Sequence, residues 1–188
     1  MFIEQINNPG DLKKLDINEL PALAEEVRAL IIEKVSACGG HLASNLGVIE
    51  LTIALHYIFN SPFDKLIFDV SHQTYCHKII TGRKDAFILQ EQYKTVTGFS
   101  NPQESEHDIF AIGHTSTSIS LACGLAKARD LKGSAENIIA VIGDGALDGG
   151  EAFEALNYVT ELDSNFIVII NDNEMSIPEN HGALGRHL

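Results

Sequence analysis

Two short apolar runs constrain the fold of this chain more than any other feature. Residues 138–142 (IIAVI) and 166–170 (FIVII) are apolar throughout, and a stretch with helical character, 149–162, lies between them. A strand with one solvated face would alternate apolar and polar side chains, whereas these runs suit strands that are buried on both faces. Two such strands joined by a helix predict parallel pairing in an α/β sheet.

The rest of the chain continues this alternation. Apolar residues at helical spacing predict further helices at 16–38, 48–59 and 118–130. Further short apolar runs are expected to form strands at 66–70 and 109–112. Residues 39–47 are expected to be a loop, and residues 84–108 an exposed excursion. The expected architecture is a single α/β domain over residues 1–188, in three layers, with helices on both faces of a parallel sheet.

Polar residues follow each of the two clearest strand candidates. Asp144 lies in a Gly-Asp-Gly turn after the first run, and Asn173 closes an Asn-Asp-Asn segment after the second, 173 − 144 = 29 residues later. Because ligands of parallel sheets bind beyond the carboxyl ends of the strands, these two side chains are expected side by side. Their oxygens suit a hard cation such as Mg²⁺, which could hold a diphosphate. The alternative is that Asp144 merely caps the following helix.

The glycines of this turn also allow a second cofactor. Gly143, Gly145 and Gly149 resemble a loosened dinucleotide fingerprint, in which Asp172 would bind the ribose of a nicotinamide cofactor. Asp148 occupies the position of the last glycine, and the carboxylate of Asp144 would repel a pyrophosphate unless a cation lay between them. A nicotinamide-dependent oxidoreductase therefore stays open as an alternative, and nucleotide binding without a metal would support it.

Three of the eight histidines lie in loops beside predicted elements. His41, His72 and His114 could donate to phosphates or transfer protons near neutral pH. His56 falls within an apolar helical pattern and is expected to be packed in the core, and His187 is expected at the surface.

The composition excludes several classes of protein. The net charge of −13 disfavours nucleic-acid binding, because the chain would approach phosphates against its own field. The three cysteines form no C-x-x-C pair, which suits a reducing compartment. The sequence has neither a signal peptide nor an apolar run long enough to span a bilayer, so a cytoplasmic protein without a membrane partner is expected.

Motifs spread over nearly the whole chain resemble those of one family. They are residues 40–47 (GHLASNLG), 50–56 (ELTIALH), 69–75 (DVSHQTY), 77–82 (HKIITG), 98–99 (GF), 104–108 (ESEHD), 113–118 (GHTSTS), 143–146 (GDGA) and 171–177 (NDNEMSI). In this order they resemble the N-terminal part of the 1-deoxy-D-xylulose-5-phosphate synthases, which are transferases of the transketolase type. The resemblance implies the diphosphate-binding domain of a thiamine-diphosphate enzyme.

The resemblance also implies roles for particular residues. Magnesium would be bound by Asp144, Asn173 and the backbone carbonyl of Met175. The residues implied to contact the cofactor are His72, Gly113, His114, Thr115, Gly145, Ala146 and Asn173. His41 would lie near the reacting carbons. The family joins pyruvate, after loss of carbon dioxide, to glyceraldehyde 3-phosphate, and its product feeds isoprenoid and thiamine biosynthesis.

The chain departs from the family pattern in three respects. Ser71 stands where the family usually has glycine, and Thr115 replaces a common serine. The chain is also shorter than family members, so we expect a truncated protein that lacks the pyrimidine-binding and C-terminal domains. We therefore expect no catalysis by the chain alone, and association into a homodimer or with a complementary chain. A non-catalytic remnant or interaction subunit is the alternative.

Overall fold

The chain divides into two compact units in the computed structural model, which describes residues 1–162 and 164–172. The first unit consists of residues 1–61 and 72–111. The second consists of residues 62–71 together with the described residues from 112 onward. The expectation of one diphosphate-binding domain over the whole chain stays a prediction.

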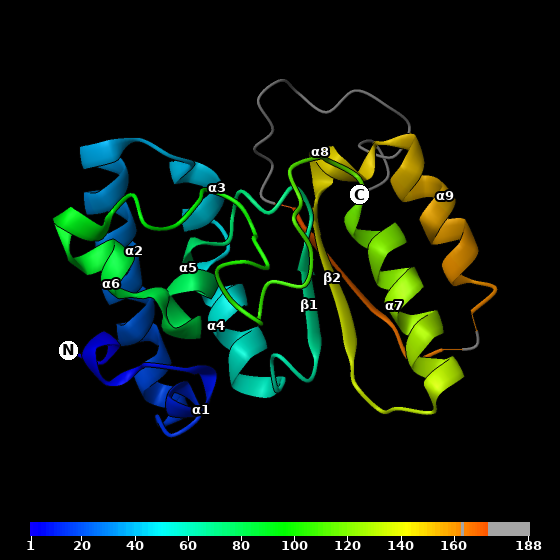
Figure 1. Ribbon diagram of the computed structural model, residues 1–188, viewed down its shortest axis with the longest axis horizontal. Helices are drawn as coiled ribbons and strands as arrows, with labels where there is room; N and C mark the ends of the chain where they lie inside the picture. The colour runs from blue at the N-terminus through cyan, green and yellow to red at the C-terminus, as the bar shows by residue number, and fades with distance from the viewer. Residues whose placement is uncertain (163, 173–188) are drawn as a thin grey trace. The chain divides into compact units, whose positions relative to one another are not determined.

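The second unit contains a parallel sheet of three strands in the order β1-β2-β3 (Figure 1). The strands are β1 (Lys65–Phe68), β2 (Ile138–Gly143) and β3 (Ile167–Asn171). Helix α7 (Ser118–Lys132) packs against β1 and β2, and α9 (Gly150–Val159) packs against α7. The α/β class and the parallel pairing predicted from the apolar runs are thereby confirmed.

The two runs differ in burial. The side chains of Ile138 to Ile142 in β2 are at most 1% exposed, as expected for a strand covered on both faces. In β3 the side chains are half-buried, and Ile170 is 40% exposed. The prediction of burial on both faces therefore holds for β2 and is wrong for β3, which lies at one edge of the described sheet.

The first unit is helical and is built around a long helix, α2 (Leu20–Cys38). A capping box between Asp16 and Glu19 begins the preceding turn, η2 (Ile17–Glu19), and Gly39 ends α2 with a φ of +78°. The other elements of this unit are η1 (Ile3–Gln5), α1 (Pro9–Leu12), α3 (Leu42–Leu46), α4 (Ile49–Ile58), α5 (Tyr75–Lys78), η3 (Ile79–Arg83), α6 (Asp85–Ile88) and η4 (Gln90–Gln92). The helices predicted at 16–38 and 48–59 are confirmed.

Three local predictions are wrong. Residues 109–112 form no strand. Within the first unit, the Phe110 carbonyl accepts from the Ser100 hydroxyl (2.8 Å), so its partner is a side chain and not a neighbouring strand. The loop expected at 39–47 contains α3. The exposed excursion expected at 84–108 contains α6 and η4 and is anchored by the buried Asp108, which is 3% exposed.

No helix within the described residues combines the length and the apolar character needed to cross a membrane.

Candidate functional site

The turn after β2 and the end of β3 lie side by side in the second unit. The strand register pairs Gly143 with Asn171, so Asp144 and Asp172 follow neighbouring strands at the same edge of the sheet. Asp144 begins the short helix α8 (Asp144–Leu147) and is half-buried, whereas Asp172 is exposed. The register agrees with the expected placement of an acid beside the Asn-Asp-Asn segment. Asn173 and Met175 lie outside the described residues, so the complete metal site stays a prediction.

The oxygens at this edge have the chemistry that a hard divalent cation requires. Within residues 1–162 and 164–172, no group of three His, Cys, Asp or Glu side chains could hold a metal ion. A magnesium site of the expected kind does not need three such side chains, because amide and backbone carbonyl oxygens also serve as ligands. A Cβ built on Gly143 or Gly113 would meet no atom of the described residues within 4 Å, so neither backbone is covered by that part of the chain. The residues present therefore fit a cation with a bound diphosphate.

Asp69 fixes the loop that begins α7. Its backbone N–H donates to the Val141 carbonyl (2.8 Å), directly after the last register pair of β1 and β2. Its buried carboxylate accepts from the N–H groups of Ser116 (2.8 Å) and Ser118 (2.9 Å), which stabilises the N-terminus of α7. The loop carrying Gly113, His114 and Thr115, all exposed, is thus tied to the sheet. Asp69 is a positioning residue that periodicity did not reveal, since its partners lie 47 and 49 residues away.

Ser116 joins this loop to the turn after β2. Its hydroxyl donates to the Ala146 carbonyl (2.7 Å), and its φ is +69°. A Cβ built on Gly149 would lie 1.9 Å from the Ser116 hydroxyl oxygen. Gly149, one of the glycines that resembled a dinucleotide fingerprint, is therefore needed for the close approach of two protein segments.

We expect Gly149→Ala to destabilise the second unit by about 1–3 kcal/mol, because Ser116 must move and its bond to Ala146 weakens. Thermal unfolding followed by circular dichroism measures the change. Gly150→Ala is the matched control, since a Cβ there meets nothing within 4 Å, and it should leave stability unchanged or slightly raised. Equal stability of the two variants would contradict the close-packing argument.

Ser71 lies where the family pattern has glycine, and its backbone shows why glycine suits the position. Val70 and Ser71 have φ values of +57° and +68°, a conformation that side chains with a Cβ adopt at a cost. The Ser71 hydroxyl donates to the Ile112 carbonyl (2.9 Å) within the second unit. This hydrogen bond offsets part of the strain.

In the first unit, Asn45 brings together the two histidines that sequence analysis singled out there. Its side-chain amide donates to the carbonyls of His41 (2.6 Å) and His72 (2.9 Å), and its oxygen accepts from the Tyr75 N–H (2.9 Å). The rings of His41 and His72 meet edge to face with centroids 5.3 Å apart, and Phe99 contacts His41 at the same separation. Asn45 is fully buried, and its role was visible in the sequence only as part of the family motif.

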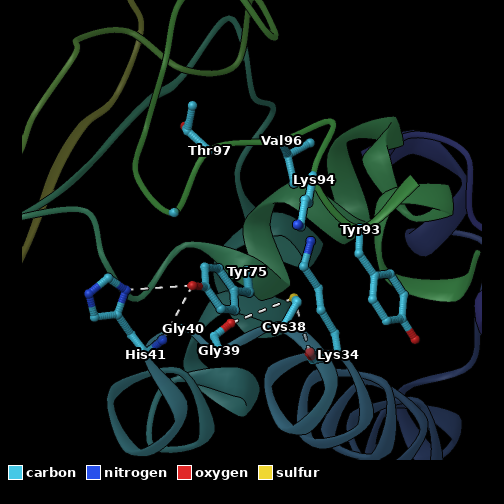
Figure 2. A pocket seen from close by; sticks show the side chains of 11 residues that line it. Lys34, Cys38, Gly39, Gly40, His41, Tyr75, Tyr93, Lys94, Val96 and Thr97 are labelled. Atoms are coloured by element: carbon cyan, nitrogen blue, oxygen red, sulfur yellow. Dashed lines mark hydrogen bonds between the residues drawn. The ribbon is translucent and has the colours of Figure 1, made fainter. Parts of the chain in front are cut away.

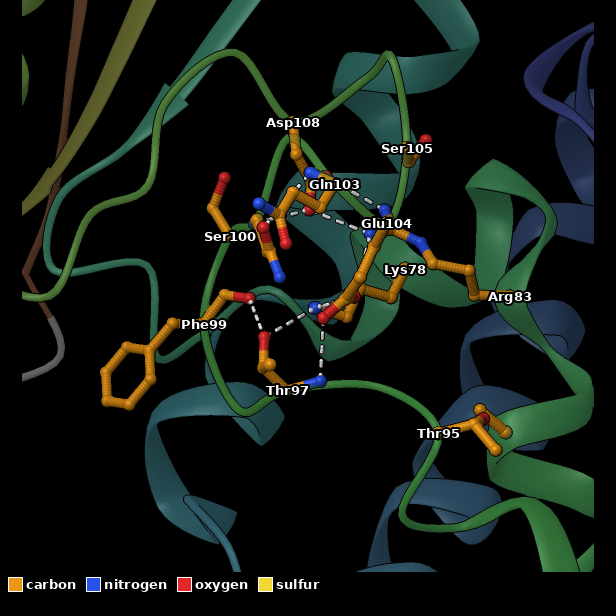
Figure 3. A network of polar contacts seen from close by, with 12 residues as sticks. Lys78, Arg83, Thr95, Thr97, Phe99, Ser100, Gln103, Glu104, Ser105 and Asp108 are labelled. Carbon is orange, nitrogen blue, oxygen red and sulfur yellow. Dashed lines mark hydrogen bonds and ion pairs between the residues drawn. The ribbon is translucent and has the colours of Figure 1, made fainter.

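A buried polar network anchors the segment that carries Phe99 (Figure 3). The Asp108 carboxylate accepts two hydrogen bonds from Arg83 (2.8 and 2.9 Å), one from the Asn101 N–H (2.8 Å) and one from His77 Nε2 (2.9 Å). His77 Nδ1 lies 2.9 Å from His56 Nε2. Because the carboxylate can only accept, His77 carries its proton on Nε2, and His56 donates to the other nitrogen.

The network continues on the other side of Arg83. Glu104 pairs with Lys78 (2.5 Å) and Arg83 (3.3 Å) and accepts from the Thr97 N–H (2.8 Å). Although burial acts to raise the pKa of Asp108, the hydrogen bonds from His77 and Arg83 hold it well below its usual range. His56 is packed in the core as predicted; His187 lies outside the described residues.

Stability should fall as the pH is lowered from about 7 to about 5, by about 1–3 kcal/mol. Burial lowers the pKa values of His56 and His77, and it lowers that of His107 to about 4. The unfolded chain takes up protons at these histidines near their ordinary pKa of about 6.5, while the folded chain does not. Below about pH 4, stabilisation by Asp108 is lost as well.

Urea unfolding at a series of pH values measures this dependence. Lys127→Met, a change at an exposed position in the second unit, should leave the pH profile unchanged. A stability that is flat or that rises toward pH 5 would show that the buried histidines do not titrate as described.

A parallel sheet with helices around it, in which one strand ends in a Gly-Asp-Gly turn, defines an α/β fold and is consistent with a thiamine-diphosphate-binding domain. Residues 3–188 match the family model described as 1-deoxy-D-xylulose-5-phosphate synthase. The chain belongs to the 1-deoxy-D-xylulose-5-phosphate synthase family.

Curated relatives of that name match along the chain. The protein from Caldanaerobacter subterraneus subsp. tengcongensis is 60% identical over 187 residues, which cover 100% of the chain and 30% of the relative. That from Alkaliphilus oremlandii is 58% identical over 187 residues, with the same coverage of each. A synthase numbered 1 from Geobacter sulfurreducens is 57% identical over 182 residues, 97% of the chain and 29% of the relative. The chain thus spans about 30% of the length of these relatives.

Proposed function

We propose that this chain is the part of a 1-deoxy-D-xylulose-5-phosphate synthase that binds magnesium and the diphosphate of thiamine diphosphate. The family is thiamine-diphosphate dependent, which supports the cofactor. The observation that carries the proposal is the register of β2 and β3, which aligns Gly143 with Asn171 at the carboxyl edge of the sheet. In the proposal, Asp144, Asn173 and the carbonyl of Met175 bind the cation.

The other residues of the second unit would orient the diphosphate. Gly145 and Ala146 follow Asp144 in the turn, and we assign them to cofactor contact together with Asn173. Gly113, His114 and Thr115 are assigned to the same function, in a loop that Asp69 and Ser116 hold in one conformation.

His72 and His41 are the residues of the first unit that we assign to the reaction. His72 would contact the cofactor, and His41 would lie near the reacting carbons. Asn45 binds the backbone carbonyls of both, and their rings meet edge to face. An imidazole can hold or transfer a proton near neutral pH, which suits the proton movements of acyl-group transfer. Bound thiamine diphosphate would supply the carbanion chemistry that joins decarboxylated pyruvate to glyceraldehyde 3-phosphate.

We further propose that the 188-residue chain does not turn over these substrates alone. In the family pattern, the glutamate that activates the aminopyrimidine belongs to a domain outside the matched region. A second copy of the chain or a complementary chain would act as partner. A steady-state assay with both substrates, thiamine diphosphate and magnesium tests this; measurable turnover by the pure chain would refute it.

Calorimetry of the chain with thiamine diphosphate tests the binding function. We expect saturable binding with magnesium, no binding after chelation of the metal, and weak binding of thiamine, which lacks the diphosphate. Absence of any magnesium-dependent affinity would favour a non-catalytic interaction module. Metal-independent binding of a nicotinamide dinucleotide would favour the oxidoreductase alternative.

A further inference from the structure

The first unit contains a pocket of about 360 Å³ between the C-terminal end of α2 and residues 93–98 (Figure 2). The basic residues Lys34, Lys94 and His41 line it, together with Tyr75 and Thr97. None of the described residues that line it is acidic. The chain has a net charge of −13, so this pocket is a basic region in an otherwise acidic protein.

Lys34 is the buried charge of the pocket. The residue is 6% exposed, and its ammonium group donates to the Ala86 carbonyl (2.8 Å). It also lies over the Phe87 ring, 4.0 Å from the centroid, and 5.7 Å from that of Tyr93. Within the described part of the chain, no carboxylate forms an ion pair with it; Glu104, which acts on it electrostatically, pairs with Lys78 and Arg83 instead. A buried cation without a counter-charge is costly, and an anion in the pocket would offset that cost.

The end of α2 does not oppose an anion as strongly as a bare helix C-terminus would. The Cys38 thiol donates to the carbonyls of Lys34 (3.2 Å) and Gly39 (3.7 Å), as Figure 2 shows. The Gly39 N–H donates to the Val35 carbonyl (2.9 Å). The carbonyl groups of Val35 and Gly39, which would otherwise present negative charge there, thus already have donors.

We propose that this pocket binds a phosphate monoester or inorganic phosphate through Lys34 and Lys94. Two ammonium groups favour a dianion over a carboxylate, since lysine binds phosphate as a point charge. The volume is at the lower end of ligand pockets, which suits a free phosphate or one carrying a few carbons. The two lysines are not among the residues assigned to the diphosphate, so this site goes beyond the proposed function.

Phosphate titration of the intact chain, without magnesium or thiamine diphosphate, tests the proposal by ³¹P NMR and calorimetry. Saturable binding is expected, and Lys34→Met and Lys94→Met should each weaken it at least about tenfold. Lys127→Met, at an exposed position on α7, should leave it within about twofold. Glycerol 3-phosphate and acetate, titrated in parallel, separate an esterified phosphate from a free one and a phosphate from a carboxylate.

Tighter binding of glycerol 3-phosphate than of inorganic phosphate would support a metabolite site, and equal binding a phosphate-ion site. Acetate binding as tightly as phosphate would overturn the proposal, as would unsaturable binding or unchanged affinity in Lys94→Met. Lys94 is exposed, so this variant remains decisive even if Lys34→Met unfolds. The titration contains neither thiamine diphosphate nor magnesium. A failure to bind phosphate would therefore contradict this proposal without bearing on magnesium-dependent binding of the cofactor, which the calorimetry described above tests.

Discussion

Asp108→Ala is expected to destabilise the first unit by about 3–5 kcal/mol, a large part of the stability of a typical domain. The substitution removes the carboxylate that accepts from Arg83, His77 and the Asn101 N–H, and it leaves a largely buried guanidinium without one of its counter-charges. Breaking one side of a buried ion pair is costly, because the remaining charge stays desolvated. Urea unfolding followed by tyrosine fluorescence reports mainly on this unit, which contains Tyr57, Tyr75 and Tyr93, whereas Tyr158 lies in the second unit.

Glu106→Ala provides the matched control in the same segment. Glu106 is exposed, and its removal should change the free energy of unfolding by less than about 0.5 kcal/mol. A loss of less than about 1 kcal/mol in Asp108→Ala would mean that the network contributes little net stability, and that the segment carrying Phe99 is held by other contacts.

Asp144→Ala is expected to weaken magnesium-dependent binding of thiamine diphosphate at least about 100-fold. The carboxylate would be the one anionic ligand in the proposed set, since Asn173 and Met175 offer neutral oxygens. Calorimetry with thiamine diphosphate at fixed excess magnesium measures the change, and circular dichroism confirms that the variant is folded.

Asp148→Ala is the control for this experiment. Asp148 is exposed at the end of α8, four residues after Asp144, and its removal should alter cofactor affinity by no more than about twofold. If both variants lost affinity equally, general electrostatics of the acidic turn would explain the effect better than a metal ligand.

The local sequence pattern was sufficient to predict those helices and strands whose buried side chains recur at regular spacing along the sequence. The runs at 138–142 and 166–170 became β2 and β3, and the apolar spacing before Gly39 became α2. The turn at Asp144 was located because it follows directly on a strand whose direction is fixed by parallel pairing.

Residues that act through distant partners could not be found in this way. Asp69 binds N–H groups 47 and 49 residues away, Asn45 binds residues up to 30 away, and Asp108 meets His77 across 31 residues. Each is an ordinary polar residue in its own segment, and its function exists only after the chain has folded. The short run at 109–112 was misread for the same reason, because whether an apolar tetrapeptide becomes a strand depends on a neighbouring strand.

The most direct test of the account is a crystal structure of the chain with thiamine diphosphate and Mn²⁺, an anomalous scatterer that prefers the same oxygen ligands as Mg²⁺. The account predicts one metal peak at the carboxyl edge of the sheet. A carboxylate oxygen of Asp144 and the side-chain oxygen of Asn173 should both lie at coordination distance, about 2.1 Å for magnesium, with the diphosphate on the same ion. A peak that lacks either side chain, or a diphosphate bound without the metal, would contradict it.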